Sequence, residues 1–376
     1  MSRKPTRLNR RPNASRKSLK ASPIWGYTIS SIVTVSFIKS SSSNAVASDE
    51  KAGITRRTIF PVRDYDLAAT LTSGQAFRWQ LREGGWEGIV ESRWVRLRAE
   101  GDWPRHESCR SRRQRAHSFA LGSQSLLTSA ATARGRDARV IVAETAEPVN
   151  DWQWLADYLQ VELDLAGVLA TFPDDESMRA AVAACRGLRL LRQDPWECLA
   201  SFICSSTKQI VQIRQIVALL CERFGEPVRV PRGREPAFSF PSFERIAAAR
   251  ESELRACKAG FRAPNLRAAA RMIARGEVDL ARLSASSVTE ARADLMRLPG
   301  VGRKIADCVL LFACGFQDAF PVDVWVTKAL RRLYFPGRRR SLKRLQKFAA
   351  THFGPFGGYA QQYLFHYARI HAKLKK

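Results

Sequence analysis

The stretch LMRLPGVGRKIADCVLLFACG (295–315) restricts the fold of this chain more than any other. Apolar residues flank a short turn that contains Pro299, Gly300 and Gly302, which predicts two helices joined by a tight hairpin at 298–302. Glycine accepts positive φ and has no side chain, so backbone N–H groups can point outward where the second helix begins. Because such groups attract anions, the turn predicts a phosphate site, although it could simply join two packed helices.

Two ionisable residues follow the hairpin. Lys304 stands two residues after Gly302, and Asp323 begins the next helical pattern in FPVDVWVTKAL (320–330). Asp is favoured at a helix N-cap, where the helix dipole keeps its carboxylate ionised. Lys304 alone could be a phosphate contact, a solvated cation or a nucleophile.

The charge of the chain indicates the class of partner. The net charge is +27, and +17 remains when residues 1–60 are set aside. A strongly basic protein favours a polyanion, and nucleic acid is the partner we expect. The eight cysteines form neither a CxxC motif nor a dense Cys/His cluster, which predicts a reduced intracellular protein without a metal site.

The pattern of residue types along the sequence predicts an α+β protein. AFRWQLR (76–82), GWEGIVE (85–91) and RWVRLRAE (93–100) predict an antiparallel meander, and ARVIVAE (138–144) a further strand. The Arg- and Ser-rich segment 103–137 predicts a disordered insertion, either a solvated loop or a loose DNA contact. Helical spacing follows after residue 150. We therefore expect an antiparallel β domain at 55–165 and an all-α body at 166–376.

The N-terminal residues 1–54 allow three interpretations. A basic stretch precedes the apolar run IWGYTISSIVTVSFI (24–38) and the small residues of NAVASDE, which together are typical of a signal peptide. The acid-free, Arg- and Ser-rich composition is also typical of a transit peptide. We favour a disordered or misassigned extension, because the cysteines argue against export. The apolar run is short for a membrane span, and we expect no membrane association.

The hairpin, Lys304 and Pro-Val-Asp323 together resemble the helix–hairpin–helix DNA glycosylase superfamily, whose bifunctional members have a lysine at this place. With LLRQDPWECLASFICSS (190–206), SGQAFRW (73–79) and GFRA (260–263), the chain is similar to the 8-oxoguanine DNA glycosylase/lyase family from about 60 to 372. Endonuclease III-type relatives lack the N-terminal sheet and usually carry a C-terminal iron–sulfur cluster. No cysteine follows Cys314, so such a cluster cannot form here.

The resemblance implies a base-excision-repair enzyme that flips 8-oxoguanine out of double-stranded DNA and removes it. Lys304 would attack C1′ and form a Schiff base, whose β-elimination cuts the strand, and Asp323 would orient the nucleophile and stabilise positive charge on the sugar. It also implies no cofactor and a monomer, in the bacterial cytoplasm (nucleoid) or in a eukaryotic nucleus or mitochondrion. The alternatives are a glycosylase for another damaged purine and a non-catalytic DNA-binding protein.

The resemblance extends to a pocket for the base. Gly74 matches a glycine whose carbonyl accepts the N7–H proton that distinguishes 8-oxoguanine from guanine. Gln361 and Phe365 match residues that bond the edge and stack on the face of the base, and their i, i+4 spacing places them on one helix face. Cys308 matches a cysteine against the opposite face. Gly74 could instead be a turn glycine, and Phe365 and Cys308 could be core residues.

Recognition of the opposite strand is where the sequence departs from the family. Phe261 and Arg262 match an intercalating aromatic residue and a cytosine-reading arginine. Thr207 replaces an asparagine that holds the orphaned cytosine, and Gln212 stands where a second arginine is expected. One of two arginines remains, so we expect a relaxed preference for cytosine. Trp325 replaces a phosphate-binding histidine of some members, and it could form a wall of the pocket.

Overall fold

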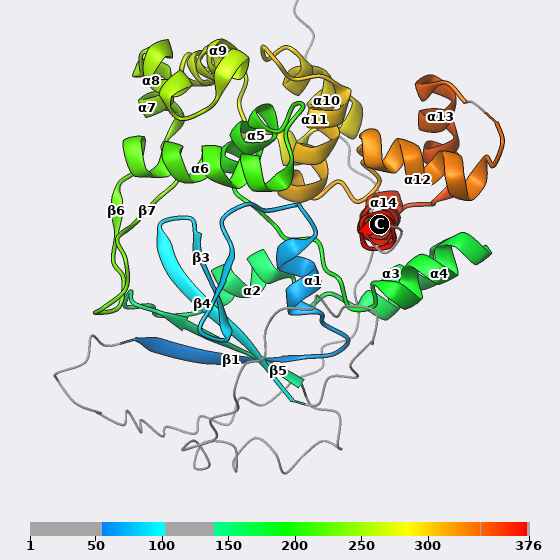
Figure 1. Cartoon of the computed structure of the whole chain (residues 1–376), viewed down its shortest axis with the longest axis horizontal. Coiled ribbons are helices and arrows are strands. Elements are labelled where there is room, and N and C mark those ends of the chain that lie inside the picture. The colour runs from blue at the N-terminus through cyan, green and yellow to red at the C-terminus, as the bar shows by residue number, and fades with distance from the viewer. Residues whose placement is uncertain (1–54, 102–138, 339, 374–376) are drawn as a thin grey trace, which may run out of the picture. The chain divides into compact units, whose positions relative to one another are not determined.

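The computed structural model describes residues 55–101, 139–338 and 340–373 (Figure 1). The predicted extension at 1–54 and the whole of the predicted insertion at 103–137 therefore lie outside the described residues. Within the described ranges, no helix is both long enough and apolar enough to cross a membrane. An antiparallel sheet comes first along the chain, and a series of helices follows it.

The sheet has five strands in the order β1-β5-β4-β3-β2, all antiparallel to their neighbours. The strands are β1 (Arg56–Val62), β2 (Gln80–Arg82), β3 (Gly85–Val90), β4 (Arg93–Glu100) and β5 (Arg139–Thr145). The strand predicted at 76–82 forms only over its last three residues. Before them, Ala76, Phe77 and Trp79 are buried as core side chains.

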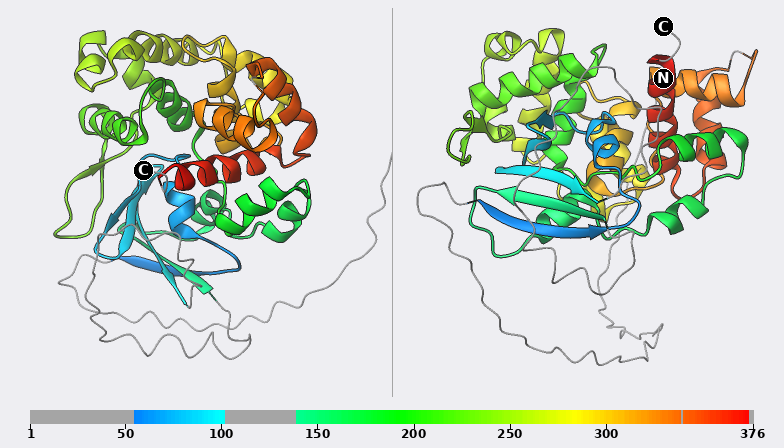
Figure 2. Two further views of the ribbon diagram at one scale, coloured as in Figure 1. Left: turned by 45° about the vertical axis from the view of Figure 1, so that its right-hand side comes forward. Right: turned by 60° about the horizontal axis from the view of Figure 1, so that its bottom comes forward.

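Two short helices cover one face of this sheet (Figure 2). They are α1 (Leu67–Thr72) and α2 (Gln153–Leu159), and their leucines share an apolar cluster with Trp79, Leu97 and Ile141. Between β2 and β3, Glu83 (φ 46°) and Gly84 (φ 72°) make the turn. Two consecutive positive φ values define a type I′ turn, whose twist matches that of paired strands.

The remaining described helices form the α-helical body with a second, larger apolar cluster. They are α3 (Leu165–Ala170), α4 (Glu176–Ala184), α5 (Pro195–Cys204), α6 (Ile210–Phe224), α7 (Phe243–Ala248), α8 (Glu251–Ala256), α9 (Ala263–Ala274), α10 (Val288–Met296), α11 (Arg303–Val309), α12 (Val324–Tyr334), α13 (Leu342–His352) and α14 (Gly357–Lys373). A two-stranded ribbon, β6 (Pro227–Val228) with β7 (Ala237–Phe238), follows α6. An antiparallel sheet followed by a helical body confirms the predicted α+β class.

A buried glutamine fastens the loop after α1 to the start of the helical body. The Gln75 amide donates to the Arg189 carbonyl at 2.8 Å and accepts from the Leu191 backbone N–H at 2.8 Å. The Gln193 amide in turn donates to the Gln75 carbonyl at 2.9 Å. Buried polar groups are costly to leave unpaired, so these bonds hold the loop that contains Gly74 in one place.

Candidate active site

The predicted hairpin lies between α10 and α11, with Leu298 and Val301 buried beneath it. Gly300 has φ +80°, and a Cβ atom there would come within 2.9 Å of the Asn265 Cβ. Only glycine fits that position without strain. Gly302 begins α11, and no atom lies within 4 Å of the place where its Cβ would be. The backbone at Gly302 is therefore open to an approaching group.

Lys304 is the second residue of α11 and reaches across to the C-terminal end of α5. Its ammonium donates to the Ser205 hydroxyl at 3.1 Å and lies 4.9 Å from the centre of the Phe202 ring. One turn later, the buried Asp307 carboxylate is paired with Arg292 at 2.6 Å and lies 3.6 Å from Arg303. This ion cluster holds α11, and with it Lys304, against α10.

Asp323 is the N-cap of α12, as its place in the sequence predicts. Its Oδ1 accepts a hydrogen bond from the Val326 backbone N–H at 2.7 Å. Burial raises the pKa of this carboxyl group, while the N–H bond and the positive charges of Lys304 and Arg369 act in the opposite direction. Among the described residues, no direct ion pair joins Asp323 to Lys304, although the charge of one affects the other.

Cys308 lies one turn after Lys304 and is buried. Burial raises the pKa of its thiol to about 12, so the thiol is neutral near pH 7. The positive charge of Lys304 lowers this pKa and the carboxylate of Asp323 raises it. Lys304, Asp323 and Cys308 therefore share one electrostatic environment, which their separation in the sequence does not show.

The structure also brings Gly74 to Phe365. Gly74 has φ +88°, and a Cβ there would lie 2.7 Å from Cδ1 of Ile210 and 3.4 Å from both Phe365 Cε1 and Arg369 Nη1. No hydrogen bond among the described residues ends on the Gly74 carbonyl oxygen. Gly74 and the Phe365 ring are thus neighbours, and the Gly74 carbonyl has no hydrogen-bond donor among the described residues.

Gln361 lies one turn before Phe365 on α14 and is only 4% exposed. Its Oε1 atom is buried without a hydrogen-bond partner among the described residues. A buried amide oxygen of this kind is uncommon in proteins and costs free energy until a donor reaches it. The predicted contact between Gln361 and a base would supply such a donor.

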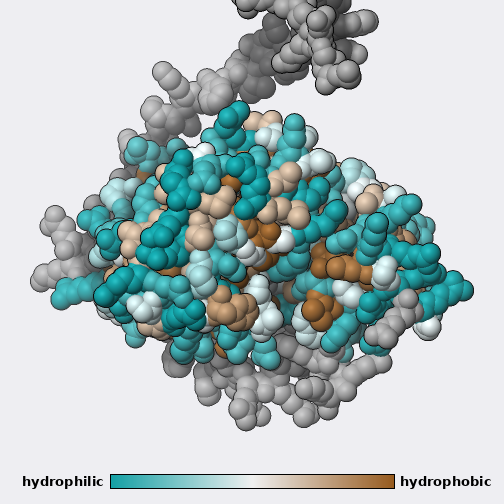
Figure 3. All heavy atoms as spheres, turned by 90° about the horizontal axis from the view of Figure 1, so that it is seen from above, coloured by the Kyte–Doolittle hydropathy of each residue, from teal (hydrophilic) through white to brown (hydrophobic). Residues whose placement is uncertain are grey.

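Of the four residues expected at the opposite strand, Thr207, Gln212 and Phe261 are exposed and Arg262 is buried. Phe261 is 59% exposed, whereas Arg262 is 3% exposed and donates to the Ser206 carbonyl and the Thr207 hydroxyl, each at 2.8 Å. Gln212 accepts from the Gln209 backbone N–H at 3.0 Å and so caps α6. The arginine expected to reach the DNA is therefore turned inward in this structure. Apolar residues on the upper face of Figure 1 form small patches among hydrophilic ones (Figure 3).

Two arginines near Gly74 and Phe365 were not predicted from the sequence. Arg369 donates to the Ser73 carbonyl at 3.3 Å, and its guanidinium carbon lies 5.3 Å from the centre of the Phe365 ring. Arg214 is half-buried on α6, one turn after Ile210. The position of Arg369 at i+4 from Phe365 was the signal that could have identified it.

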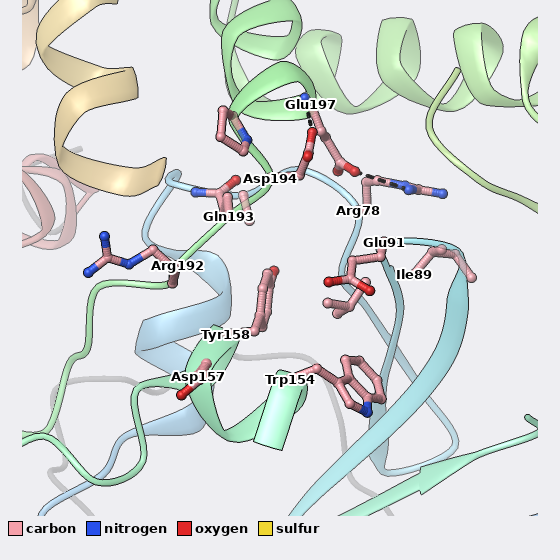
Figure 4. A pocket seen from close by; sticks show the side chains of 13 residues that line it. Arg78, Ile89, Glu91, Trp154, Asp157, Tyr158, Arg192, Gln193, Asp194 and Glu197 are labelled. Carbon is pink, nitrogen blue, oxygen red and sulfur yellow. Dashed lines mark hydrogen bonds and ion pairs between the residues drawn. The ribbon is translucent and has the colours of Figure 1, made fainter. Parts of the chain in front are cut away.

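A separate cavity of about 420 Å³ opens at the other end of α5, between β3 and α2 (Figure 4). Four carboxyl groups (Glu91, Asp157, Asp194, Glu197) and two guanidinium groups (Arg78, Arg192) are in its lining. Arg78 and Glu197 are paired at 3.3 Å. An excess of carboxylates repels phosphate, so this cavity does not suit DNA, and nothing in the sequence predicted it.

Comparison with known proteins agrees with this arrangement. Residues 57–199 match the model for the 8-oxoguanine DNA glycosylase N-terminal domain, and residues 200–352 match that for the HhH-GPD superfamily of base excision DNA repair proteins. The probable N-glycosylase/DNA lyase of Methanothermobacter thermautotrophicus is 32% identical over 219 residues, which are 53% of this chain and 69% of the relative.

Two solved structures are similar along most of their length. MBOgg1 in complex with a low-affinity DNA ligand has 30% identity and a TM-score of 0.70, and covers 85% of this chain and 96% of its own. The Clostridium acetobutylicum 8-oxoguanine glycosylase/lyase, bound to double-stranded DNA with cytosine opposite 8-oxoguanine, has 27% identity and a TM-score of 0.68, covering 84% and 98%. The chain belongs to the 8-oxoguanine DNA glycosylase family of the helix–hairpin–helix base excision repair superfamily.

Proposed function

We propose that this chain is a bifunctional DNA glycosylase and lyase that removes 8-oxoguanine from double-stranded DNA. One observation supports this most: Lys304 and Asp323 begin two successive helices and share one electrostatic environment with Cys308. A merely phosphate-binding hairpin needs neither the carboxylate nor the pocket beside it. The enzyme acts where DNA is found, in a bacterial nucleoid or a eukaryotic nucleus or mitochondrion.

In the proposed reaction, the neutral amine of Lys304 attacks C1′ as the bond from C1′ to the base breaks. The base takes the bonding electrons together with the proton that the amine loses, and C1′ is then bonded to both Nζ and O4′. Asp323, which is fixed by its bond to Val326, stabilises the positive charge that develops on the sugar. The C1′–O4′ bond then breaks, the remaining proton on Nζ moves to O4′, and a Schiff base results. The Schiff base acidifies the C2′ protons, so that β-elimination expels the 3′ phosphate.

The proposed pocket reads the base through a backbone acceptor. 8-Oxoguanine carries a proton on N7 that guanine lacks, and the unoccupied Gly74 carbonyl would accept it. Gln361 would bond the edge of the base, and Phe365 and Cys308 would enclose its faces. The buried, unpartnered Oε1 of Gln361 supports this assignment.

For the opposite strand we propose a relaxed preference for cytosine. Gln212 has a neutral amide in place of a second guanidinium group, and the oxygen of that amide caps α6. Arg262 must leave the Ser206 carbonyl before it can reach a base. Phe261, exposed beside it, is the residue proposed to fill the space that the flipped nucleotide leaves.

A trapping assay tests the proposal. Wild-type protein and the Lys304→Gln variant are incubated with borohydride and duplexes that carry 8-oxoguanine opposite each of the four bases. We expect a covalent protein–DNA adduct with the wild type and none with Lys304→Gln. Lys343→Gln, an exposed lysine on α13, is the matched control. Adduct formation by Lys304→Gln at the wild-type level would refute the assignment, and a panel of alkylated purines would reveal a different lesion.

A further inference from the structure

Arg214 and Arg369 lie beside the proposed base pocket without an acidic partner. The Arg214 side chain is half-buried, its Nε atom is inaccessible and unbonded, and no ion pair or side-chain hydrogen bond among the described residues includes it. Arg369 is half-buried and donates to the neutral Ser73 carbonyl at 3.3 Å. Its Nη1 atom also lies against Gly74.

Arg214 and Arg369 both lie near Gly74, because Ile210, one turn before Arg214 on α6, and Nη1 of Arg369 both adjoin that glycine. Burial lowers the pKa of Arg369, the charge of Arg214 lowers it further, and Asp323 partly offsets both. Arg98 and Arg292, by contrast, each have a carboxylate partner: Arg98 bonds Glu144 at 2.7 Å and Arg292 bonds Asp307 at 2.6 Å. Two cations that a single nearby carboxylate only partly compensates favour an anion between them in a partly desolvated site.

We propose that Arg214 and Arg369 form an anion site at the mouth of the base pocket, and that this site binds a backbone phosphate beside the extruded nucleotide. The inference rests on the proposed function, because the phosphates flanking a base in the pocket are covalently linked to it. Guanidinium groups match phosphate oxygens in geometry and charge. Binding there would relieve the repulsion between the two arginines.

The test uses chemical neutralisation of single phosphates. Binding is measured with duplexes that contain a tetrahydrofuran abasic site, with each flanking phosphate in turn replaced by an uncharged methylphosphonate. Arg214→Gln and Arg369→Gln should each weaken binding to the unmodified duplex about tenfold. Each should also reduce the slope of log K against log salt by about one. Arg369→Lys should restore the slope.

The decisive quantity is the coupling between variant and phosphate. Where the bound phosphate is already uncharged, the two glutamine variants should bind as well as the wild type. Arg223→Gln, on the same helix α6 but paired with Glu253 at 3.3 Å, should lose no more than about twofold on any duplex. Losses that are the same on every duplex would overturn the inference, as would an equal loss in Arg223→Gln.

Excision of 8-oxoguanine by the wild type is measured in parallel, so the two failures can be told apart. Excision without coupling would refute the anion site and leave the proposed function intact. Coupling without excision or trapping would refute the proposed function and support a phosphate site of a DNA-binding protein. Melting temperatures within a few degrees of the wild type show that the variants are folded.

Discussion

Adding a single methyl group at Gly74 tests how tightly neighbouring side chains pack around this residue in the proposed base pocket. The Gly74→Ala variant would keep φ near +88° and place Cβ 2.7 Å from Ile210 Cδ1, while contacts with Phe365 and Arg369 at 3.4 Å would be tolerable. The left-handed backbone costs roughly 1–2 kcal/mol for alanine. Displacing the flexible end of Ile210 from its rotamer costs a further 0.5–1.5 kcal/mol or so. We therefore expect a destabilisation of about 2–3 kcal/mol in urea unfolding.

Two further variants separate these contributions. Gly84 also has positive φ, and nothing lies within 4 Å of its would-be Cβ. Gly84→Ala should therefore show the backbone cost alone, about 1–2 kcal/mol. The double variant Gly74→Ala/Ile210→Val removes the clashing Cδ1 atom and isolates the backbone cost at Gly74. Compared with Ile210→Val alone, the double variant should lose only the backbone part of the free energy of unfolding, because the clash is gone.

Activity provides the functional reading of the same variants. A shift of the Gly74 carbonyl would weaken the proposed bond to N7–H, so single-turnover excision of 8-oxoguanine should fall at least tenfold in Gly74→Ala. Gly84→Ala, in a distant turn, should excise at the wild-type rate. Normal excision by Gly74→Ala would refute the pocket assignment. A double variant no better than Gly74→Ala would refute the steric argument.

Three further predictions concern single residues. Asp323→Asn keeps the acceptor for Val326, so we expect excision to fall about 10²–10⁴-fold while DNA binding persists. Because burial raises the pKa of Asp323, the charged carboxylate destabilises the wild-type fold at pH values above that pKa. The Asp323→Asn variant should therefore be at least as stable as the wild type at pH 7, and it should lose this advantage in acid, where the wild-type carboxyl group is protonated. Asp307→Ala leaves Arg292 unpaired and should cost about 3 kcal/mol in urea unfolding; a loss below 1 kcal/mol or so would contradict this. Phe261→Ala should weaken abasic-duplex binding about tenfold without lowering the melting temperature.

Helices with two or more turns could be predicted from the sequence, because their apolar spacing repeats. The pattern of Ile213, Ile216 and Leu220 predicted α6, and all three are buried. Helices α1, α3, α7 and α8 have six residues each, too few for a period to be distinguished from chance. Strand β1 pairs with β5, and only tertiary contacts with a distant segment define it.

In the candidate site, too, local features could be predicted from the sequence and long-range contacts could not. The cap formed by Asp323 and the turn at Gly300 are local, so the sequence was sufficient to predict them. The inward orientation of Arg262 depends on the Ser206 carbonyl, 56 residues away along the chain. The proximity of Gly74 and Phe365 depends on how α14 packs against the loop after α1, which no local pattern encodes.

The bonds of Gln75 have a consequence for how selectivity can change. They hold the loop at 73–75, which contains the proposed carbonyl acceptor of Gly74, against the helical body that carries Lys304. The proposed acceptor for N7–H and the proposed nucleophile therefore stand on two different segments of the chain, which the bonds of Gln75 hold together. Exchanging the loop while keeping Gln75 would alter which base is accepted without disturbing the hairpin. Substitution of Gln75 itself would remove the bonds that hold the loop. It should reduce the discrimination between 8-oxoguanine and guanine before it lowers the rate of excision.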